Sequence, residues 1–216
     1  MTIVEHSFGS GGSEPYARAL RSEAEVLFLQ DDTRRSPMDI ARWHAEADLV
    51  DLTLLAEVTG PVLDIGCGPG RMVRAARDLG LSALGIDVSP AAVELARGLG
   101  LHVIERNIFA PIPAEGHWQT ALLVDGNIGI GGNVSELLAR CAEVIAPGGE
   151  IVVEVHSDPD RHHTYTGRLV DAQGRASAAF PWAEIGVDRL AEIAVAHGLT
   201  MIQSWELDGR GFCRLG

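Results

Sequence analysis

The stretch Val62-Leu63-Asp64-Ile65-Gly66-Cys67-Gly68-Pro69-Gly70-Arg71 decides the fold of this chain. It begins as a short apolar strand, passes through a loop rich in glycine, and opens a helix that we expect over 70–79. Glycine has no Cβ atom, so its backbone can turn sharply and approach a ligand closely. The helix behind the loop presents unpaired N–H groups at its start. The stretch therefore predicts a strand–loop–helix turn that binds a ligand.

The spacing of the glycines indicates the class of ligand. Dinucleotide-binding loops have the pattern G-x-G-x-x-G, whereas this loop has G-x-G-x-G with Asp64 ahead of it. A carboxylate at that position suits an amino-acid ammonium or an ordered water, because it would repel a pyrophosphate. A tight turn without any ligand is the alternative, although such turns do not usually need three glycines and an acid.

Strands and helices alternate around this loop. We expect strands over 61–65, 82–86, 101–105, 120–124 and 150–155, helices over 90–97, 134–145 and 187–197, and closing strands over 199–205 and 212–215. A turn is expected at 147–149 and another at Asp208-Gly209. This alternation predicts an α/β fold, a doubly wound and mostly parallel sheet. Ligands of such sheets bind beyond the carboxyl ends of the strands.

Three segments depart from the alternation and suggest how the chain is organised. Residues 1–13 are rich in Gly and Ser, as flexible tails are. Residues 14–58 read as an N-terminal helical cap, with one helix over 14–30 and a second from Pro37 to about Val58, capped by Ser36. Residues 59–216 form the ligand-binding domain, and its segment 157–185 is a lid-like insertion with a hairpin over 168–175.

Composition and charge indicate which binding partners and which cellular location to expect. The net charge of -13 repels phosphate backbones and anionic membranes, so we expect neither a nucleic-acid nor a membrane partner. The three cysteines form no C-x-x-C pair, which favours a reducing compartment. Neither a signal peptide nor an apolar stretch of about 18 residues is apparent, so a cytoplasmic location is expected. No pattern indicates the oligomeric state.

Two further patterns follow the next two strands. Asp87 ends a strand roughly twenty residues beyond the loop, where a carboxylate can accept hydrogen bonds from both ribose hydroxyls. The alternative for Asp87 is a helix-cap acid, but Ser89 already fits that role. Asn107 and Ile108 follow the third strand, and an amide beside an apolar residue can bind the amino group and the face of an adenine.

Together these residues resemble the class I S-adenosylmethionine-dependent methyltransferases. Residues 62–70 match the first motif of that family, 85–89 its second and acidic motif, and 138–149 the L-x-P-G-G stretch before the fifth strand. The resemblance covers about residues 40–216. It implies a Rossmann-like, seven-stranded sheet whose last strand is antiparallel and inserted between its neighbours. It also implies S-adenosylmethionine as the cofactor and methyl transfer to a small molecule that the sequence does not identify.

The same resemblance implies which residues bind the cofactor. They are Asp64, Gly66, Cys67, Gly68, Gly70, Asp87, Val88, Asn107, Ile108 and Asp125. The loop residues would line the methionine end, Asp87 would hold the ribose, and Val88 would lie against the adenine. Asp125 opens the stretch 125–132 after the fourth strand, where four glycines suggest close backbone approach. The stretch lacks the N/D-P-P-Y/F/W motif of enzymes that methylate DNA adenines or protein glutamine amides.

Candidate catalytic residues are His156 and Asp125. His156 ends the fifth strand at the edge expected to face the ligand and could act as a general base, although a merely hydrogen-bonded histidine would look the same. The segment after it has metal-ligand residue types, but an acidic loop explains them equally well, so no metal is predicted. Trp43 reads as a core residue, and Trp182 as a possible substrate contact. A non-catalytic cofactor-binding protein and a nicotinamide-dependent oxidoreductase remain as alternatives.

Overall fold

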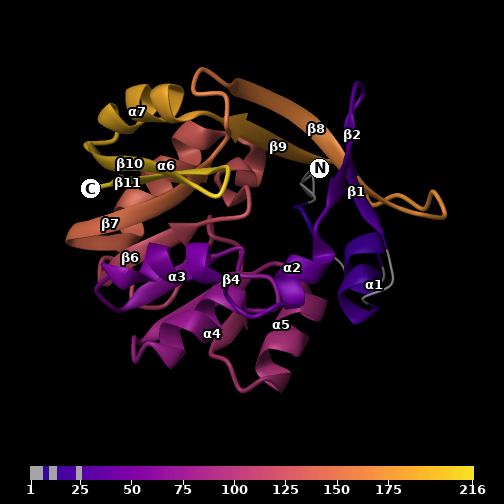
Figure 1. Cartoon of the computed structure of the whole chain (residues 1–216), viewed down its shortest axis with the longest axis horizontal. Helices are drawn as coiled ribbons and strands as arrows, with labels where there is room; N and C mark the ends of the chain where they lie inside the picture. The colour runs from indigo at the N-terminus through magenta and orange to yellow at the C-terminus, as the bar shows by residue number, and fades with distance from the viewer. Residues whose placement is uncertain (1–6, 10–13, 23–25) are drawn as a thin grey trace.

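The larger of two sheets carries the loop, as the computed structural model of the chain shows for residues 7–9, 14–22 and 26–216. Its strand order is β10-β11-β7-β6-β3-β4-β5 (Figure 1). The strands are β3 (Val62–Ile65), β4 (Ala83–Asp87), β5 (Val103–Glu105), β6 (Trp118–Leu123), β7 (Ile145–Val155), β10 (Met201–Leu207) and β11 (Arg210–Leu215). The first five are parallel, and β11 runs antiparallel between β7 and β10. The expected Rossmann-like sheet, with its inserted last strand, is confirmed.

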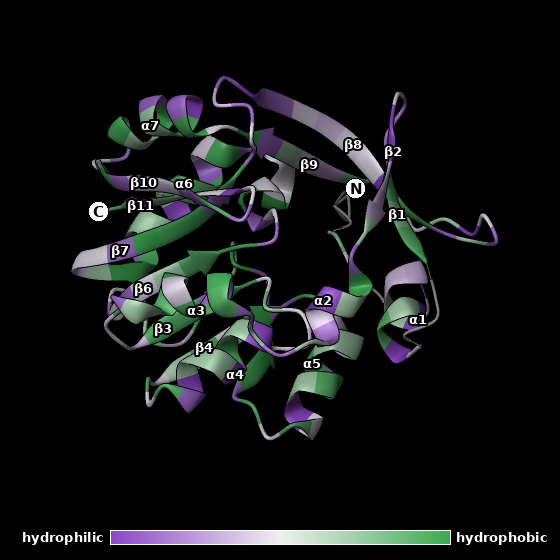
Figure 2. Ribbon diagram, viewed as in Figure 1, coloured by the Kyte–Doolittle hydropathy of each residue, from purple (hydrophilic) through white to green (hydrophobic). Residues whose placement is uncertain are grey.

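Helices cover both faces of this sheet. They are α3 (Leu49–Ala56), α4 (Arg71–Asp78), α5 (Pro90–Gly98), α6 (Val134–Val144) and α7 (Val187–Val195). Side chains alternate along β3, so Leu63 and Ile65 enter the core beneath α6 and α7, whereas Val62 enters the core beneath α3 and α4. Figure 2 shows the hydrophobic residues gathered in these strands and in parts of the helices. The same alternation turns Asp64 toward α3 and α4.

The smaller sheet corrects the expectation for the first segment. Its order is β2-β1-β8-β9, all antiparallel, with β1 (Leu27–Gln30), β2 (Arg35–Met38), β8 (His162–Asp171) and β9 (Phe180–Ile185). The helix expected over 14–30 ends early, as α1 (Pro15–Arg21). Leu27 and the three residues after it pair with β8 instead, so long-range strand pairing overrides their helical spacing.

The second expected helix, from Pro37 to Val58, is also divided. Pro37 lies in β2, an edge strand, where a missing N–H is tolerated. The helices are α2 (Ile40–His44) and α3, and each has its own cap, because Asp39 accepts a hydrogen bond from Arg42 N and Asp48 accepts one from Asp51 N. The segment 14–58 is therefore not a purely helical cap, since it contributes two strands.

The insertion 157–185 is a long hairpin of β8 and β9, and the expected hairpin over 168–175 is its tip. Figure 1 shows β8 and β9 reaching from the end of the larger sheet across to β1 and the N-terminal segment. The expected turn at 147–149 lies within β7 as an irregularity in its pairing with β6. Residues 1–6 and 10–13 of the expected tail are outside the described residues, and Phe8 packs against Tyr16. No helix in the described chain is long and apolar enough to cross a membrane.

Candidate active site

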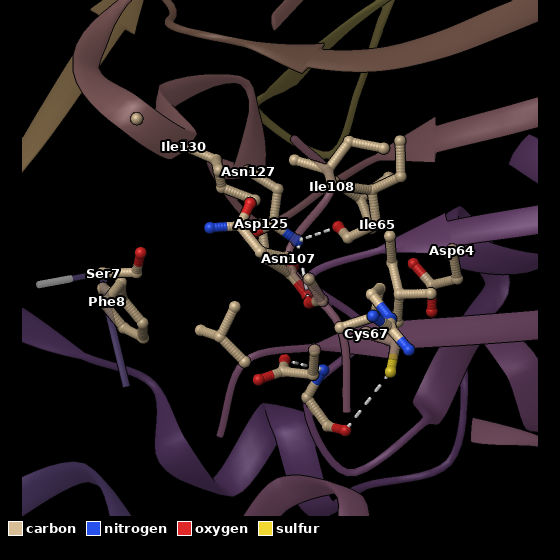
Figure 3. A pocket seen from close by; sticks show the side chains of 18 of the residues that line it. Ser7, Phe8, Asp64, Ile65, Cys67, Asn107, Ile108, Asp125, Asn127 and Ile130 are labelled. Carbon is tan, nitrogen blue, oxygen red and sulfur yellow. Dashed lines mark hydrogen bonds between the residues drawn. The ribbon is translucent and has the colours of Figure 1, made fainter. Parts of the chain in front are cut away.

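One cavity lies where the carboxyl ends of β3, β4 and β6 face the smaller sheet and the N-terminal segment. It brings together nine of the ten predicted cofactor residues. These are Asp64, Gly66, Cys67, Gly68, Asp87, Val88, Asn107, Ile108 and Asp125. Figure 3 shows Ser7 and Phe8 on the opposite side of the cavity from Asp64 and Cys67.

Gly70, the tenth residue, is absent from the cavity lining. Its φ of 93° is in the left-handed region, and a Cβ atom there would lie 2.6 Å from Leu101 Cδ1. Gly70 is therefore required for packing, because the start of α4 lies too close to Leu101 for a side chain at this position. Gly66 and Gly68 also have positive φ values, of 72° and 54°, but both line the cavity. The bare backbone that a ligand could approach is that of these two residues.

Asp87 fastens the glycine loop to the end of β4. Its Oδ2 accepts a hydrogen bond from Gly68 N at 2.8 Å, and its Oδ1 accepts one from Ser89 N at 2.7 Å. Burial raises the pKa of its carboxyl to about 6, against the lowering effect of these N–H groups. Ser89 caps α5, as the sequence predicts. Asp87 thus has a structural role in the turn as well as a place in the cavity.

Asp64 has no hydrogen-bond partner for either carboxylate oxygen within the described residues. Asp64 is only 2% exposed. Burial raises the pKa of its carboxyl to about 7, although the positive charge of Arg71 acts in the opposite direction. A buried polar group without a partner is costly, so it marks a place where a ligand or water is expected to bind. Asp64 therefore marks a position suited to a cationic or hydrogen-donating ligand.

A cluster of charged side chains lies beside Asp64, and the sequence did not reveal it. Arg71 forms ion pairs with Asp51 of α3 and with Asp125. Asp51 also bonds Arg42 Nη2 at 2.8 Å and Arg210 Nη1 at 3.2 Å. Only the position of Arg71, directly after the glycine loop, could have signalled this cluster, because its partners come from segments distant in sequence.

Asp125 lies at the cavity with an unusual backbone. Its φ is 54°, in the left-handed region that Asp tolerates better than most residues. Its carboxylate pairs with Arg71, and its N–H donates to Glu154 Oε2 at 2.7 Å. Burial raises the pKa of Asp125, opposed by Arg71. The structure thus brings Asp125 to the predicted place but already engages its carboxylate in an ion pair.

Asn127, in the turn η1 (Asn127–Gly132), is a cavity residue whose role the sequence missed. Its Nδ2 donates to the carbonyls of Ile65 and Gly66, both at 2.9 Å. A Cβ atom on Gly66 would lie 2.8 Å from that Nδ2. Asn127 therefore holds the glycine loop from across the cavity, and it requires a glycine at position 66.

Two of the four glycines of 126–132, Gly129 and Gly132, permit close backbone approach, as expected, and the partner is β9. A Cβ atom on Gly129 would lie 2.3 Å from Ala183 O, and one on Gly132 would lie 2.8 Å from Pro181 Cβ. The hairpin packs directly on η1. These glycines position the insertion over the cavity.

The expected adenine end is formed by Asn107 and Ile108. Asn107 Oδ1 accepts a hydrogen bond from Phe109 N at 3.0 Å, and Ile108 is 3% exposed while lining the cavity. Arg140 Nε donates to Ile108 O at 2.9 Å, which fixes this turn from the side of α6. An apolar surface next to an amide is thus available, and its use for an adenine stays a prediction.

Four aromatic rings, which we call the aromatic wall, line the side of the cavity formed by the N-terminal segment and β9. They belong to Phe8, Tyr16, Trp43 and Trp182. The Phe8 ring centroid lies 5.1 Å from that of Tyr16 and 5.2 Å from that of Trp182. The Tyr16 and Trp43 centroids are 5.7 Å apart. Trp43 therefore packs in a core cluster, as predicted, and also borders the cavity.

His156 is not among the cavity-lining residues. Its Nδ1 accepts a hydrogen bond from Asp158 N at 3.0 Å, and its backbone bridges to Gly186. His163 stacks on Tyr165 in the smaller sheet. Within the described ranges, no group of three or more His, Cys, Asp or Glu side chains could hold a metal ion. The role of His156 as a base stays a prediction without geometric support.

Known proteins similar to this chain agree with the geometry. A family model described as a methyltransferase domain matches residues 38–204. Trans-aconitate 2-methyltransferase of Paracidovorax citrulli is 28% identical over 127 residues, which cover 57% of this chain and 46% of that protein. A ubiquinone biosynthesis O-methyltransferase of Chelativorans sp. is 32% identical over 102 residues, covering 43% and 38%. The chain spans about half or less of the length of these relatives.

A solved structure extends the similarity to the whole fold. It is that of an S-adenosylmethionine-dependent methyltransferase from Bacteroides fragilis in complex with S-adenosyl-L-homocysteine. The TM-score is 0.77 at 20% sequence identity, and the match covers 94% of this chain and 92% of that chain. At this identity the likeness concerns the fold.

Proposed function

The chain belongs to the family of S-adenosylmethionine-dependent methyltransferases, and from this premise we propose that it transfers a methyl group to a small molecule. The observation that carries the proposal is the cavity itself. One side has the glycine loop, an unpartnered Asp64 and Asp87, and the other side has the aromatic wall. A binding site for a charged cofactor thus faces a separate surface suited to an acceptor.

The residues of the cavity fit S-adenosylmethionine, the methyl donor of the family. The unpartnered carboxylate of Asp64 matches an ammonium group, since a buried charge needs an opposite charge or donors. Asp87 ends β4 with one N–H on each oxygen, and a carboxylate oxygen has a second lone pair that could accept a hydroxyl. Ile108 and Asn107 would hold the adenine. Gly70 is not part of this proposed binding site, because it packs against Leu101 outside the cavity lining.

The bound cofactor would supply an electrophilic methyl group on a positively charged sulfur, which becomes a neutral thioether after transfer. The residues of this chain would then have two tasks. They align the acceptor with the methyl group, which lowers the barrier by several kcal/mol, about 7–11 in the best cases. They also exclude water, a task for which the hairpin packed on η1 is well placed. Asp125, paired with Arg71, would orient groups rather than accept a proton.

The net charge of the chain and the names of its relatives bear on the class of acceptor. The net charge of -13 disfavours nucleic acid as a partner. The names of the two relatives refer to trans-aconitate and to ubiquinone biosynthesis, so small acceptors occur among similar proteins. We propose that this chain also acts on a small molecule, with a cytoplasmic location and without a membrane partner.

Two measurements test the proposal. Calorimetric titration with S-adenosylhomocysteine and, separately, with NAD should show binding of the first only. NAD binding alone would favour the oxidoreductase alternative. Labelled cofactor incubated with acceptor mixtures should yield a labelled low-mass product. Tight binding of S-adenosylhomocysteine without transfer to any acceptor would indicate the non-catalytic alternative.

A further inference from the structure

We propose that the methyl acceptor has a flat, apolar ring and no net negative charge, and that it binds against the aromatic wall. This inference rests on the proposed function and names the substrate class of the same cavity. Three features of the cavity carry it: the ring surfaces, the unused hydrogen-bond donors on those rings, and the balance of charge around them.

The ring surfaces come from segments far apart in the chain. Phe8 precedes α1, Tyr16 lies in α1, Trp43 lies in α2, and Trp182 lies in β9. Offset and edge-to-face contacts between aromatic rings stabilise a complex by more than the area they bury would. The four rings pack against one another and all line the cavity, so a planar ligand there could contact more than one of them.

Three rings in the aromatic wall carry polar atoms that could donate a hydrogen bond. The Tyr16 hydroxyl and the indole N–H groups of Trp43 and Trp182 form no hydrogen bond with the described part of the chain. Trp118, by contrast, is buried outside this cavity, and its Nε1 donates to Pro113 O at 3.0 Å. Buried Tyr and Trp usually find such a partner. The wall is therefore apolar in area but retains donors for an oxygen or nitrogen on a ring-shaped ligand.

The position of the Tyr16 hydroxyl links the wall to the cofactor side. It lies 3.6 Å from where a Cβ atom of Gly68 would be, so it reaches the glycine loop. Burial and the nearby carboxylates of Asp87 and Asp125 raise the pKa of Tyr16 well above its usual value. Tyr16 is therefore a neutral phenol that can donate a hydrogen bond between the acceptor side and the loop.

The charge balance disfavours anionic acceptors. The charged residues that line the cavity are four carboxylates and two guanidinium groups: Asp64, Asp87, Asp125, Glu136, Arg71 and Arg106. Arg71 is already paired with Asp51 and Asp125. A ligand with several carboxylates would meet more negative than positive charge, and like charges at close range cost several kcal/mol. A neutral ring avoids this repulsion.

The test uses the whole protein saturated with S-adenosylhomocysteine and three probes of similar carbon skeleton. They are 2-naphthol, its 6,8-disulfonate, and decahydro-2-naphthol, which is neutral but not planar. We expect calorimetry to show 2-naphthol binding about threefold to tenfold tighter than the saturated alcohol and at least about tenfold tighter than the disulfonate. Equal or tighter binding of the disulfonate or of the saturated alcohol would overturn the proposal, and so would the absence of 2-naphthol binding.

Variants locate the binding site. Trp182→Leu and Trp43→Leu should each weaken 2-naphthol binding by about threefold or more, while the affinity for S-adenosylhomocysteine stays within about twofold and shows that the variant is folded. Trp205→Leu, on β10 and outside the cavity lining, is the matched control and should change neither affinity. If both wall variants keep full 2-naphthol affinity, the wall is not the acceptor site. If the unaltered protein does not bind S-adenosylhomocysteine, the proposed function is refuted instead.

Discussion

Replacing Asp64 with Asn should stabilise the ligand-free protein at pH 8 and at the same time weaken cofactor binding. The Asp64 pKa is raised from 3.8 to about 7 in the folded protein, so the folded state holds the proton more tightly than the unfolded state. The stabilising contribution of this carboxyl is complete below about pH 4 and is lost as the pH rises through 7. About three pKa units correspond to up to about 4 kcal/mol.

Asn stays neutral at every pH, so this loss should disappear in the variant. The difference in unfolding free energy between variant and unaltered protein should therefore grow by up to about 4 kcal/mol in favour of the variant from pH 4 to pH 8. An unpartnered Asn amide would itself cost about 1–3 kcal/mol, so the net gain at pH 8 is smaller than that limit. Urea denaturation at the two pH values measures it. Asp32→Asn, at an exposed position, is the control and should show no such growth.

Cofactor binding should respond in the opposite direction. If Asp64 pairs with the ligand ammonium, the ionised fraction of a group with pKa about 7 rises from about 9% at pH 6 to about 91% at pH 8, so affinity rises about tenfold. Asp87, with its pKa of about 6, adds about twofold. In Asp64→Asn only the smaller rise should remain, with affinity lower by about 1.5–3 kcal/mol at pH 8. A flat pH profile in the unaltered protein would refute the assignment of Asp64.

Four other substitutions test the rest of the site. Asp87→Ala should weaken S-adenosylhomocysteine binding by about 1–3 kcal/mol in calorimetry, and unchanged affinity would contradict its ribose role. Asp51→Asn should destabilise the protein by about 3–5 kcal/mol in urea denaturation, because it removes a buried carboxylate that pairs with Arg42, Arg71 and Arg210. Gly129→Ala should lower the melting temperature by several degrees, because overpacking against β9 costs about 1–3 kcal/mol. His156→Ala should leave turnover with an identified acceptor unchanged, whereas a large loss would restore its role as a base.

The glycine loop was predictable because its chemistry is local. The strand, the positive φ values of Gly66 and Gly68, and the cap of α5 by Ser89 all depend on residues adjacent in sequence. The parallel sheet followed from strands and helices alternating at regular intervals. The positions of Asp87 and Asn107 followed in turn, since the carboxyl ends of parallel strands meet at one edge.

The N-terminal segment could not be predicted in the same way. The apolar spacing of 14–30 fits a helix, yet Leu27 belongs to β1 because β8, over 130 residues later, offers it a partner. The Arg71 cluster is another case, because Asp51, Arg71 and Arg210 come from three separate segments. His156 illustrates another limit of local reasoning, since a residue type suited to catalysis at a strand end is absent from the cavity lining, and its role as a base stays a prediction.

The arrangement of charge around the cavity explains why two different ligands could bind there side by side. Asp125 is paired with Arg71, and the Asp87 oxygens accept backbone N–H groups. Asp64 differs from both, because neither of its oxygens has a partner among the described residues. The uncompensated charge thus lies on the loop side, across from the aromatic wall, so a cation is attracted to one side and a neutral ring to the other. Tyr16, which belongs to the wall and whose hydroxyl reaches Gly68, connects the two sides.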